Sequence, residues 1–341
     1  MASRYWVGTS NPGWNNVAGS KWSASSGGAS GASAPGPNDD VFLDANSSAG
    51  DPPLCIVTLT DNVEIKSLTL TGFTGQLVIG GTPFTLTINA GGIVAHSSMS
   101  FVNFGILKFT STSGTRTVSA DGGLGRVIID GVGGTFNVSA SQVNELSILG
   151  GTVTLGSCNF GSIISSGSGV RSLSLGSATL TQINSATFLD PITFSGSNFT
   201  FDAGTSSILV NNSNGPKTFA GGGKTFYDVT INNGCTISGS NTFHALTIAT
   251  GQGVTFTAGT TQTIGTFTAD GGSGSVITLQ SSSAGSSYTL SAAALGTLDY
   301  LAVTDCSATG TGTEWKPTNS IGYGGNTGWI FGNVGLVGIT D

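Results

Sequence analysis

The chain has 341 residues and a formal charge of −7 at pH 7. Charged residues make up 8% of it, against about 25% in an ordinary soluble domain, and glycine supplies 55 residues. Ser, Thr or Gly interrupts the apolar residues every second or third position, so no run approaches the roughly 18 to 20 apolar residues of a membrane-spanning helix. The composition argues against membrane insertion, and the regular apolar spacing argues against a disordered chain.

The ten basic residues stand singly along the chain. A protein that follows a phosphate backbone carries such residues in a cluster, so we expect no nucleic-acid partner. They are Arg4, Lys21, Lys66, Lys108, Arg116, Arg126, Arg171, Lys217, Lys224 and Lys316.

The four cysteines, Cys55, Cys158, Cys235 and Cys306, lie far apart and have no metal-ligand spacing. Cys158 and Cys235 occupy apolar positions of strand-like stretches. We therefore expect buried free thiols rather than a disulfide framework, and no metal or other cofactor.

Residues 1–50 differ in composition from the rest of the chain. They hold three of the five tryptophans, Trp6, Trp14 and Trp22, then a run rich in Ser, Gly and Ala and an acidic turn at residues 38–40. Tryptophan buries a large area and is absent from residues 23–314, so this segment has a packing role of its own. We predict that residues 1–50 form a cap or anchoring segment. The first ten residues have no apolar core of a signal peptide, which predicts synthesis without export.

Triplets of apolar, hydroxyl and apolar residues begin near residue 54 and recur to about residue 304. Strict alternation places both apolar side chains on one face of a strand, and β-branched residues favour that conformation. The clearest copies, in residues 224–270, are Val229-Thr230-Ile231, Cys235-Thr236-Ile237, Leu246-Thr247-Ile248 and Val254-Thr255-Phe256. Further copies are Leu68-Thr69-Leu70, Leu86-Thr87-Ile88, Leu146-Ser147-Ile148, Val153-Thr154-Leu155, Leu173-Ser174-Leu175, Ile192-Thr193-Phe194, Phe199-Thr200-Phe201 and Ile277-Thr278-Leu279.

Comparable triplets are separated by 17 residues (229 to 246), 18 (68 to 86), 19 (235 to 254), 20 (153 to 173) and 27 (146 to 173). Such spacings are typical of short solenoid repeats, in which each rung is stable only when it is stacked on its neighbours. The sequence thus predicts an all-β chain whose body, residues 51–304, is a parallel β-helix (β-solenoid). The alternative is an antiparallel β-sandwich or meander, because Asn233-Gly234 and Gly150-Gly151 are also standard hairpin signals.

The pattern changes again after Thr304. The remaining residues contain Trp315 and Trp329, and residues 322–331 are rich in turn-forming residues. Exposed solenoid ends template aggregation unless they are covered. We therefore predict that residues 305–341 are a C-terminal cap and tail, which gives the body an aromatic-rich cap at each end.

Both termini resemble a known kind of protein. The start, with Tyr5-Trp6-Val7-Gly8, Trp14, Trp22-Ser23 and Asp39-Asp40-Val41-Phe42-Leu43-Asp44-Ala45-Asn46, and the end, Gly325-Asn326-Thr327-Gly328-Trp329-Ile330-Phe331, look like those of Gly/Ser/Thr-rich surface proteins of tailed-phage virions. The resemblance covers about 50 residues at the start and 30 at the end, and the middle matches only in its general Gly/Ser/Thr-rich character. It implies a β-helical body on the virion surface and no catalytic residues. Gly8 departs from the family pattern, because Thr9-Ser10-Asn11-Pro12 replaces the usual glycine-rich step.

Carboxylates are the residues most able to carry chemistry on a β-helix, because enzymes that cut polysaccharides pair two of them across a groove. None of the 17 acidic residues repeats at a fixed offset in adjacent units. We interpret Asp130, Glu145, Asp190, Asp202, Asp228 and Asp270 as solubilising or corner-capping residues at strand ends. Asp39, Asp40 and Asp44 could supply oxygen ligands to Ca²⁺, but we interpret them as an acidic turn.

The two histidines, His96 and His244, have no visible catalytic or metal-binding partner in the sequence, and we expect His244 to be an ordinary surface or rung residue. Asn198-Phe199-Thr200 formally fits a glycosylation acceptor, which has no use in a chain without an export signal.

These observations predict a non-enzymatic structural or attachment protein on the exterior of a tailed-phage virion, as a head decoration or a tail-fibre component. Its expected partners are other virion proteins and copies of itself, as a homo-oligomer such as a trimer. Rows of Thr, Ser and Asn on the outer faces are candidate contacts to a host surface glycan. The tryptophans Trp6, Trp14, Trp22, Trp315 and Trp329 are the candidate anchoring and capping residues. The alternatives are a tailspike-like polysaccharide depolymerase and a secreted bacterial adhesin.

Overall fold

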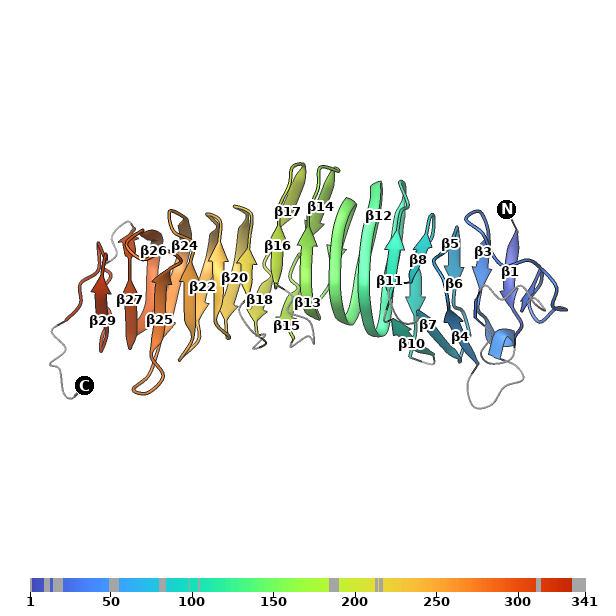
Figure 1. Ribbon diagram of the computed structural model, residues 1–341, viewed down its shortest axis with the longest axis horizontal. Helices are drawn as coiled ribbons and strands as arrows, with labels where there is room; N and C mark the ends of the chain where they lie inside the picture. Colours follow the sequence, from blue (N-terminus) through green and yellow to red (C-terminus); the bar gives the residue numbers. More distant parts are fainter. Residues whose placement is uncertain are drawn as a thin grey trace. The chain divides into compact units, whose positions relative to one another are not determined.

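Parallel strand pairing dominates the computed structural model of the chain (Figure 1). The structure describes residues 2–8, 13–14, 21–48, 55–79, 84–97, 99–103, 105–183, 190–211, 214, 217–310 and 314–332. Within these ranges there is no α-helix, and one short 3-10 helix, η1, covers Ala45–Ser48. None of the described helical residues forms a segment with the length and apolarity to cross a membrane.

The chain divides into two units, each of which is a parallel β-solenoid. The division falls inside the predicted body of residues 51–304. Unit 1 is Met1–Phe160, Ile164–Ser174 and Gly196–Thr200, and unit 2 is Gly161–Ile163, Leu175–Ser195 and Phe201–Asp341. Two strands, β13 (Cys158–Ser165) and β17 (Phe199–Asp202), contribute residues to both.

Stacks of parallel strands build unit 1. One stack is β4, β7 and β10, a second is β5, β8, β11 and part of β12, and a third contains β1, β3 and β6. Consecutive strands such as β4, β5 and β6 belong to different stacks, as a coil of three sides per rung requires. The strands are β1 (Ser3–Trp6), β2 (Trp22–Ser23), β3 (Asp40–Phe42), β4 (Ile56–Leu59), β5 (Val63–Ile65), β6 (Ser67–Thr69), β7 (Gln76–Ile79), β8 (Thr85–Ile88), β9 (Ile93–Ala95), β10 (Ser100–Asn103), β11 (Ile106–Phe109), β12 (Thr115–Leu155) and β14 (Arg171–Ser174).

The 41-residue β12 follows the coil through more than one rung. It pairs with β9 at residues 118–120, with β11 at residues 126–129 and with β14 at residues 151–154, each time in parallel. A flat strand cannot meet three such partners, so β12 bends around the core while keeping extended backbone.

Unit 2 repeats the same construction. β15, β18, β20, β22, β24 and β26 pair in succession, and so do β16, β19, β21, β23, β25, β27 and β29. The strands are β15 (Thr179–Gln182), β16 (Ile192–Phe194), β18 (Ser207–Val210), β19 (Thr218–Ala220), β20 (Thr225–Ile231), β21 (Cys235–Ser238), β22 (Thr242–Ile248), β23 (Gly253–Phe256), β24 (Thr261–Asp270), β25 (Ile277–Ser281), β26 (Tyr288–Asp299), β27 (Leu301–Thr304), β28 (Cys306–Thr309) and β29 (Ile321–Gly324).

The parallel prediction is confirmed, and the antiparallel alternative is wrong. The strands on either side of Asn233-Gly234, β20 and β21, pair in parallel with β22 and β23 of the next rung. Gly150-Gly151 lies inside β12, where Gly151 aligns with Arg171 one rung later. These glycines turn corners of the coil instead of closing hairpins. β1 and β2 pair in the antiparallel direction.

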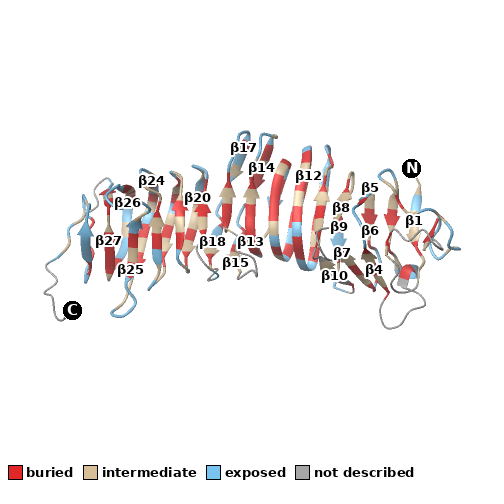
Figure 2. Ribbon diagram, in the orientation of Figure 1, coloured by how far each residue is buried: buried red, intermediate tan, exposed pale blue. Residues whose placement is uncertain are grey.

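The triplets bury their outer two residues and leave the middle residue partly exposed, so that buried and accessible residues alternate along the strands in Figure 2. Val229-Thr230-Ile231 and Leu246-Thr247-Ile248 follow this rule. Ser147 departs from it because it is 7% exposed, and Phe201 is only half-buried. Alternation alone therefore predicted most of the core.

Only some of the predicted spacings join neighbouring rungs. Leu246 lies opposite Val229, and Val254 lies opposite Cys235, as expected. Leu173 lies opposite Val153, so the 20-residue spacing is also right, but the 27-residue spacing from Leu146 is wrong. The 18-residue spacing is wrong as well, because Leu86 pairs with Val63 on a different stack from Leu68. The same triplet occurs on every side of the coil, so its pattern does not reveal which side it occupies.

The four cysteines are buried free thiols, as predicted. Burial raises the thiol pKa of Cys158 and of Cys306 to about 11 and, together with the charge of Asp190, that of Cys235 to about 12. A thiol of an unfolded chain titrates near pH 8.5. The folded state therefore disfavours the thiolate, and this contribution to stability is complete below about pH 8.5 and is lost as the pH rises toward 11 or 12.

We expect the free energy of unfolding to fall above about pH 8.5 by roughly 1.4 kcal/mol per pH unit for each of these three thiols. Urea unfolding between pH 7 and pH 10 measures this slope. Cys235→Ala should make the slope shallower by roughly 1.4 kcal/mol per pH unit, the contribution of one thiol. An unchanged slope in that variant would show that Cys235 does not contribute. At pH 8 the native protein should react with a thiol reagent only after urea is added.

Candidate functional site

The three N-terminal tryptophans form one packed cluster in unit 1. The ring centroids of Trp6 and Trp22 lie 5.1 Å apart and those of Trp14 and Trp22 lie 4.9 Å apart, both in edge-to-face geometry. Trp22 Nε1 donates to the Trp14 carbonyl oxygen at 3.1 Å, and Trp14 N donates to Thr58 O of β4 at 2.8 Å. Each side chain is at most 1% exposed. The cluster packs on the first rung, and its role as an anchor to another protein stays a prediction.

The C-terminal pair also comes together, in unit 2. Trp315 and Trp329 have ring centroids 4.8 Å apart, and Phe267 of β24 lies 5.6 Å from Trp315. Trp315 is 2% exposed and its Nε1 donates to Thr309 O at 3.1 Å. The pair thus joins the closing segment to the last rungs of this unit.

The candidate carboxylates of unit 1 are held by cations of neighbouring rungs. Asp130 accepts from Lys108 Nζ at 2.8 Å, and Glu145 accepts from Arg126 Nε at 2.7 Å. These four side chains form two separate ion pairs, each of which joins a carboxylate to a cation.

The carboxylates of the predicted acidic turn have separate partners. Asp39 accepts from the backbone N–H groups of residues 2 and 36, and Asp44 accepts from the N–H groups of residues 46 and 47 at the start of η1. Burial raises the carboxyl pKa of Asp40, but hydrogen bonds from Lys66 and Ser67 outweigh that effect and hold the pKa below its usual value. In the described part of the chain, no three His, Cys, Asp or Glu side chains gather to hold a metal ion.

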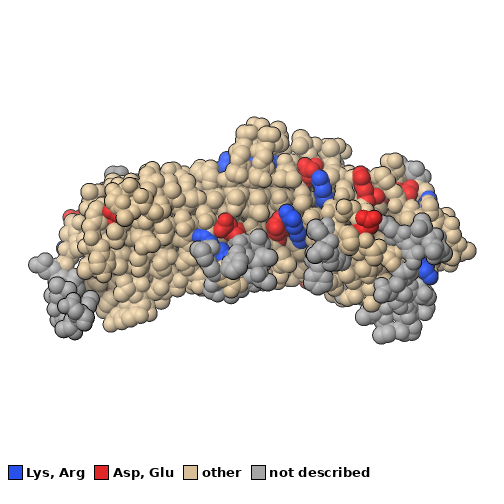
Figure 3. All heavy atoms as spheres, in the orientation of Figure 1, with Lys and Arg blue, Asp and Glu red and all other residues tan. Residues whose placement is uncertain are grey.

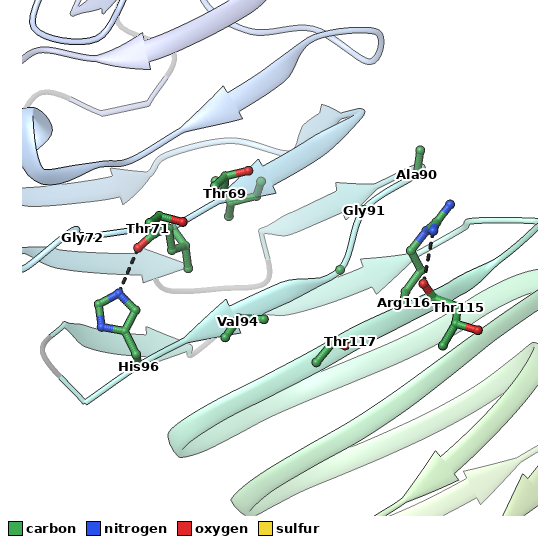
Figure 4. Close-up of a pocket in the computed structure, with 13 residues that line it drawn as sticks. Thr69, Thr71, Gly72, Ala90, Gly91, Val94, His96, Thr115, Arg116 and Thr117 are labelled. Atoms are coloured by element: carbon green, nitrogen blue, oxygen red, sulfur yellow. Dashed lines mark hydrogen bonds between the residues drawn. The ribbon is translucent and has the colours of Figure 1, made fainter.

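Each histidine lines a depression in its own unit. The first, which we call the threonine groove, holds about 500 Å³ in unit 1 and is lined by Leu68–Gly72, Ala90–Gly92, Val94, His96 and Thr115–Thr117. Figure 4 shows His96 and Arg116 on opposite sides, with Thr69, Val94 and Thr117 between them. His96 Nε2 lies 3.0 Å from the Leu70 carbonyl oxygen, so this nitrogen carries the proton. The lining includes no carboxylate.

The threonine groove lies where the ladder of unit 1 is interrupted. β6 pairs with β3 and ends its sheet, while β9 pairs with β12, and no ladder joins β6 to β9 in the described chain. The chain is still paired just before the gap, because Ala90 N donates to Lys66 O at 2.8 Å. The two strand edges therefore diverge from that point and leave the groove between them.

We expect the Leu68 amide to exchange its hydrogen faster than the Thr69 amide. The Thr69 carbonyl accepts from Leu43 N at 2.9 Å, so Thr69 faces β3 and its neighbour Leu68 faces the gap. Amides without a ladder partner exchange through small local openings. Residue-resolved exchange measured by NMR tests this difference, and equal protection of the two amides would mean that the gap is closed in solution.

The second depression, which we call the ring recess, holds about 400 Å³ in unit 2. It is lined by Phe201–Gly204, Thr225–Tyr227 of β20, Thr242–His244 of β22 and Gly265 of β24. It thus contains one of the candidate carboxylates, Asp202, whose Oδ1 accepts from Gly204 N at 3.0 Å. A second candidate, Asp190, lies elsewhere in this unit and accepts from Thr218 N at 2.7 Å.

A stacked pair of rings forms one wall of the ring recess. The planes of the Tyr227 and His244 rings are nearly parallel, with an interplanar angle of 3° and centroids separated by 4.1 Å. His244 Nδ1 lies 2.8 Å from Asp228 Oδ1, and the two side chains are 57% and 46% exposed. The structure thus corrects the expectation that His244 has no partner: it has a carboxylate and an aromatic ring, both on β20.

The sequence contains a signal for this pair. Residues 225–231 and residues 242–248 align at the 17-residue spacing, which places Tyr227 over His244. The same alignment places Asp228 opposite Ala245, one position from the histidine. Reading the triplets alone misses this pair, because both rings lie at the corner between two paired segments of β20 and β22.

The remaining candidate, Asp270, is exposed at the end of β24 and aligns with Asp299 of β26. It therefore lies outside both depressions. No family model, curated protein or solved structure matches this chain.

Proposed function

We propose that this protein is a non-enzymatic structural or attachment protein on the exterior of a tailed-phage virion, as a head decoration or a tail-fibre component. The observation that carries the proposal is the outward row of hydroxyl side chains on a stacked parallel ladder. Thr230, Thr247 and Thr268 align on successive rungs, and so do Thr236 and Thr255. Such rows suit contact with a surface glycan, because hydroxyls both donate and accept hydrogen bonds.

Two further features support the proposal. The face shown in Figure 3 carries few charged side chains over β22–β26, which fits a surface that makes neutral contacts. Gly325–Phe331 and the first 46 residues resemble phage surface proteins. Among the tryptophans of these motifs, Trp6 packs on Trp22 in unit 1, and Trp329 packs on Trp315 in unit 2.

Immunogold labelling of phage particles tests the proposed location. Particles released from the strain that carries the gene should bind antibody at regular positions, and the number and place of the labels separate head decoration from a tail fibre. Unlabelled particles, with the protein present only in the soluble lysate, would contradict the proposal. Light scattering of the purified protein tests the expected homo-oligomer.

A polysaccharide depolymerase is the second candidate, and the ring recess is the observation that favours it. The recess is lined by Asp202 and by His244, whose ion-pair partner is Asp228, and glycoside cleavage generally uses two carboxylates about 5 to 10 Å apart. Incubation with host capsule or lipopolysaccharide should yield no new reducing ends under the first proposal. Turnover that Asp228→Asn abolishes and Asp270→Asn preserves would replace it with the second.

A further inference from the structure

The Tyr227–His244 stack ends in an open position. β20, β22 and β24 are consecutive in their stack, and the alignments of Phe243 with Ile264 and of Ala245 with Thr266 place Gly265 opposite His244. Tyr227 therefore covers one face of the imidazole, and a residue without a side chain lies on the other side. Figure 1 shows β20, β22 and β24 as neighbouring strands of this unit.

Backbone packing keeps the open position free of a side chain. A Cβ atom on Gly265 would overlap the carbonyl oxygen of His244. The clash is with main chain, which cannot move aside without breaking the ladder. The gap beside the imidazole is therefore a fixed feature of the rung.

The polar groups around the stack accept hydrogen bonds. Asp228 holds His244 Nδ1 and remains 46% exposed, so its carboxylate has oxygen lone pairs left for a ligand. Asp202, Thr225 and Thr242 line the recess as well. The lining includes no Lys or Arg, which disfavours phosphate, sulfate and other anionic ligands.

We infer that the ring recess binds a neutral saccharide, with one sugar ring stacked on His244 over Gly265 and its hydroxyls donating to Asp228 and Asp202. The C–H face of a pyranose is apolar and complements the electron-rich face of an aromatic ring, while its hydroxyls need acceptors at the rim. A volume of about 400 Å³ lies within the usual range for small-ligand pockets. This inference rests on the proposed attachment function and names the glycan class that it would contact.

The two histidines make the test specific, because each reports on one depression. The probes are maltohexaose, cellohexaose, chitotetraose and mannotriose, with trigalacturonate as the anionic comparison. We expect at least one neutral oligosaccharide to shift the imidazole ¹³C–¹H signal of His244 saturably, while the signal of His96 stays in place. Titration to about 10 mM reports dissociation constants into the millimolar range.

Tyr227→Leu and Asp228→Asn should each weaken that binding by about tenfold or more, which corresponds to about 1.4 kcal/mol. Tyr323→Leu is the matched control, because Tyr323 is 66% exposed on β29 and lies outside the recess. A circular dichroism spectrum and a urea midpoint equal to those of the unchanged protein show that each variant is folded.

Four results would overturn the inference: no His244 shift with any neutral probe, equal shifts of both histidines, undiminished binding by Tyr227→Leu, or selective binding of trigalacturonate. The immunogold result is independent of these titrations. If particles are labelled but the protein binds no saccharide, the saccharide site is rejected and the virion location stands. If the protein binds a saccharide but particles are unlabelled, only the virion location is rejected.

Discussion

Phe226→Ala is expected to lower the free energy of unfolding of unit 2 by about 3 to 5 kcal/mol, the usual loss for a fully buried phenylalanine. Phe226 is 1% exposed on β20. Its ring centroid lies 6.1 Å from Phe194, 5.0 Å from Phe201, 4.9 Å from Phe219 and 5.7 Å from Phe243. The truncation removes contacts on successive rungs, and the main-chain ladder prevents the cavity from collapsing.

Urea unfolding followed by circular dichroism measures this loss. Val276→Ala is the control, because Val276 is 44% exposed in the same unit and its change should stay within about 0.5 kcal/mol. A loss below about 1 kcal/mol for Phe226→Ala would show that packing of Phe226 against the four neighbouring phenylalanine rings is not a main source of stability.

Arg171→Ala is expected to destabilise unit 1 by about 3 kcal/mol, because it removes a buried side chain and leaves the buried Ser165 hydroxyl and the carbonyl oxygens of Gly169 and Ser197 without their donor. Arg171 is 2% exposed at the start of β14. Its Nη1 donates to Gly169 O at 2.8 Å and to Ser197 O at 2.7 Å, and its Nε donates to Ser165 Oγ at 2.7 Å. The guanidinium carbon also lies 5.4 Å from the ring centroid of Phe199.

Arg171→Lys should recover only part of this stability, since an ammonium group cannot reproduce the planar fork of donors. Burial lowers the pKa of the Arg171 guanidinium, but arginine stays charged at accessible pH, so the loss should be the same at pH 6 and pH 8. Arg116→Ala is the matched control in unit 1. Its donors reach Ser111 Oγ and Thr115 O at 3.2 Å in a partly exposed site, and its removal should cost less than about 1 kcal/mol. Equal losses in Arg171→Ala and Arg116→Ala would contradict the assigned role.

Much of the fold could be predicted from the residues because strand alternation has a fixed period. Val229, Ile231, Leu246 and Ile248 are buried in the structure as the triplets require. Arg171 was foreseen only as one of ten scattered cations. The stabilising role of Arg171 depends on its hydrogen bond to Ser197, which the coil brings beside it from the next rung. No local sequence pattern indicates that contact.

The candidate site was less predictable than the core. Leu68 and Leu86 carry the same triplet yet lie on different stacks, so the gap between β6 and β9 has no signature in the pattern. The residues next to His244 in the sequence do not indicate a partner for it, because its partner Asp228 lies one rung earlier.

The sequence by itself determined that this chain is all-β, which triplet side chains fill most of its core, and that its cysteines are buried thiols. These properties follow from the two-residue period of a strand and from composition, both of which are local. The tertiary structure alone decided which residues meet across rungs: the stack of Tyr227 on His244, the open position at Gly265 and the bridging by Arg171. The physical reason is that cross-rung neighbours depend on the length and bend of every corner between them, and those vary from rung to rung while the triplets stay the same.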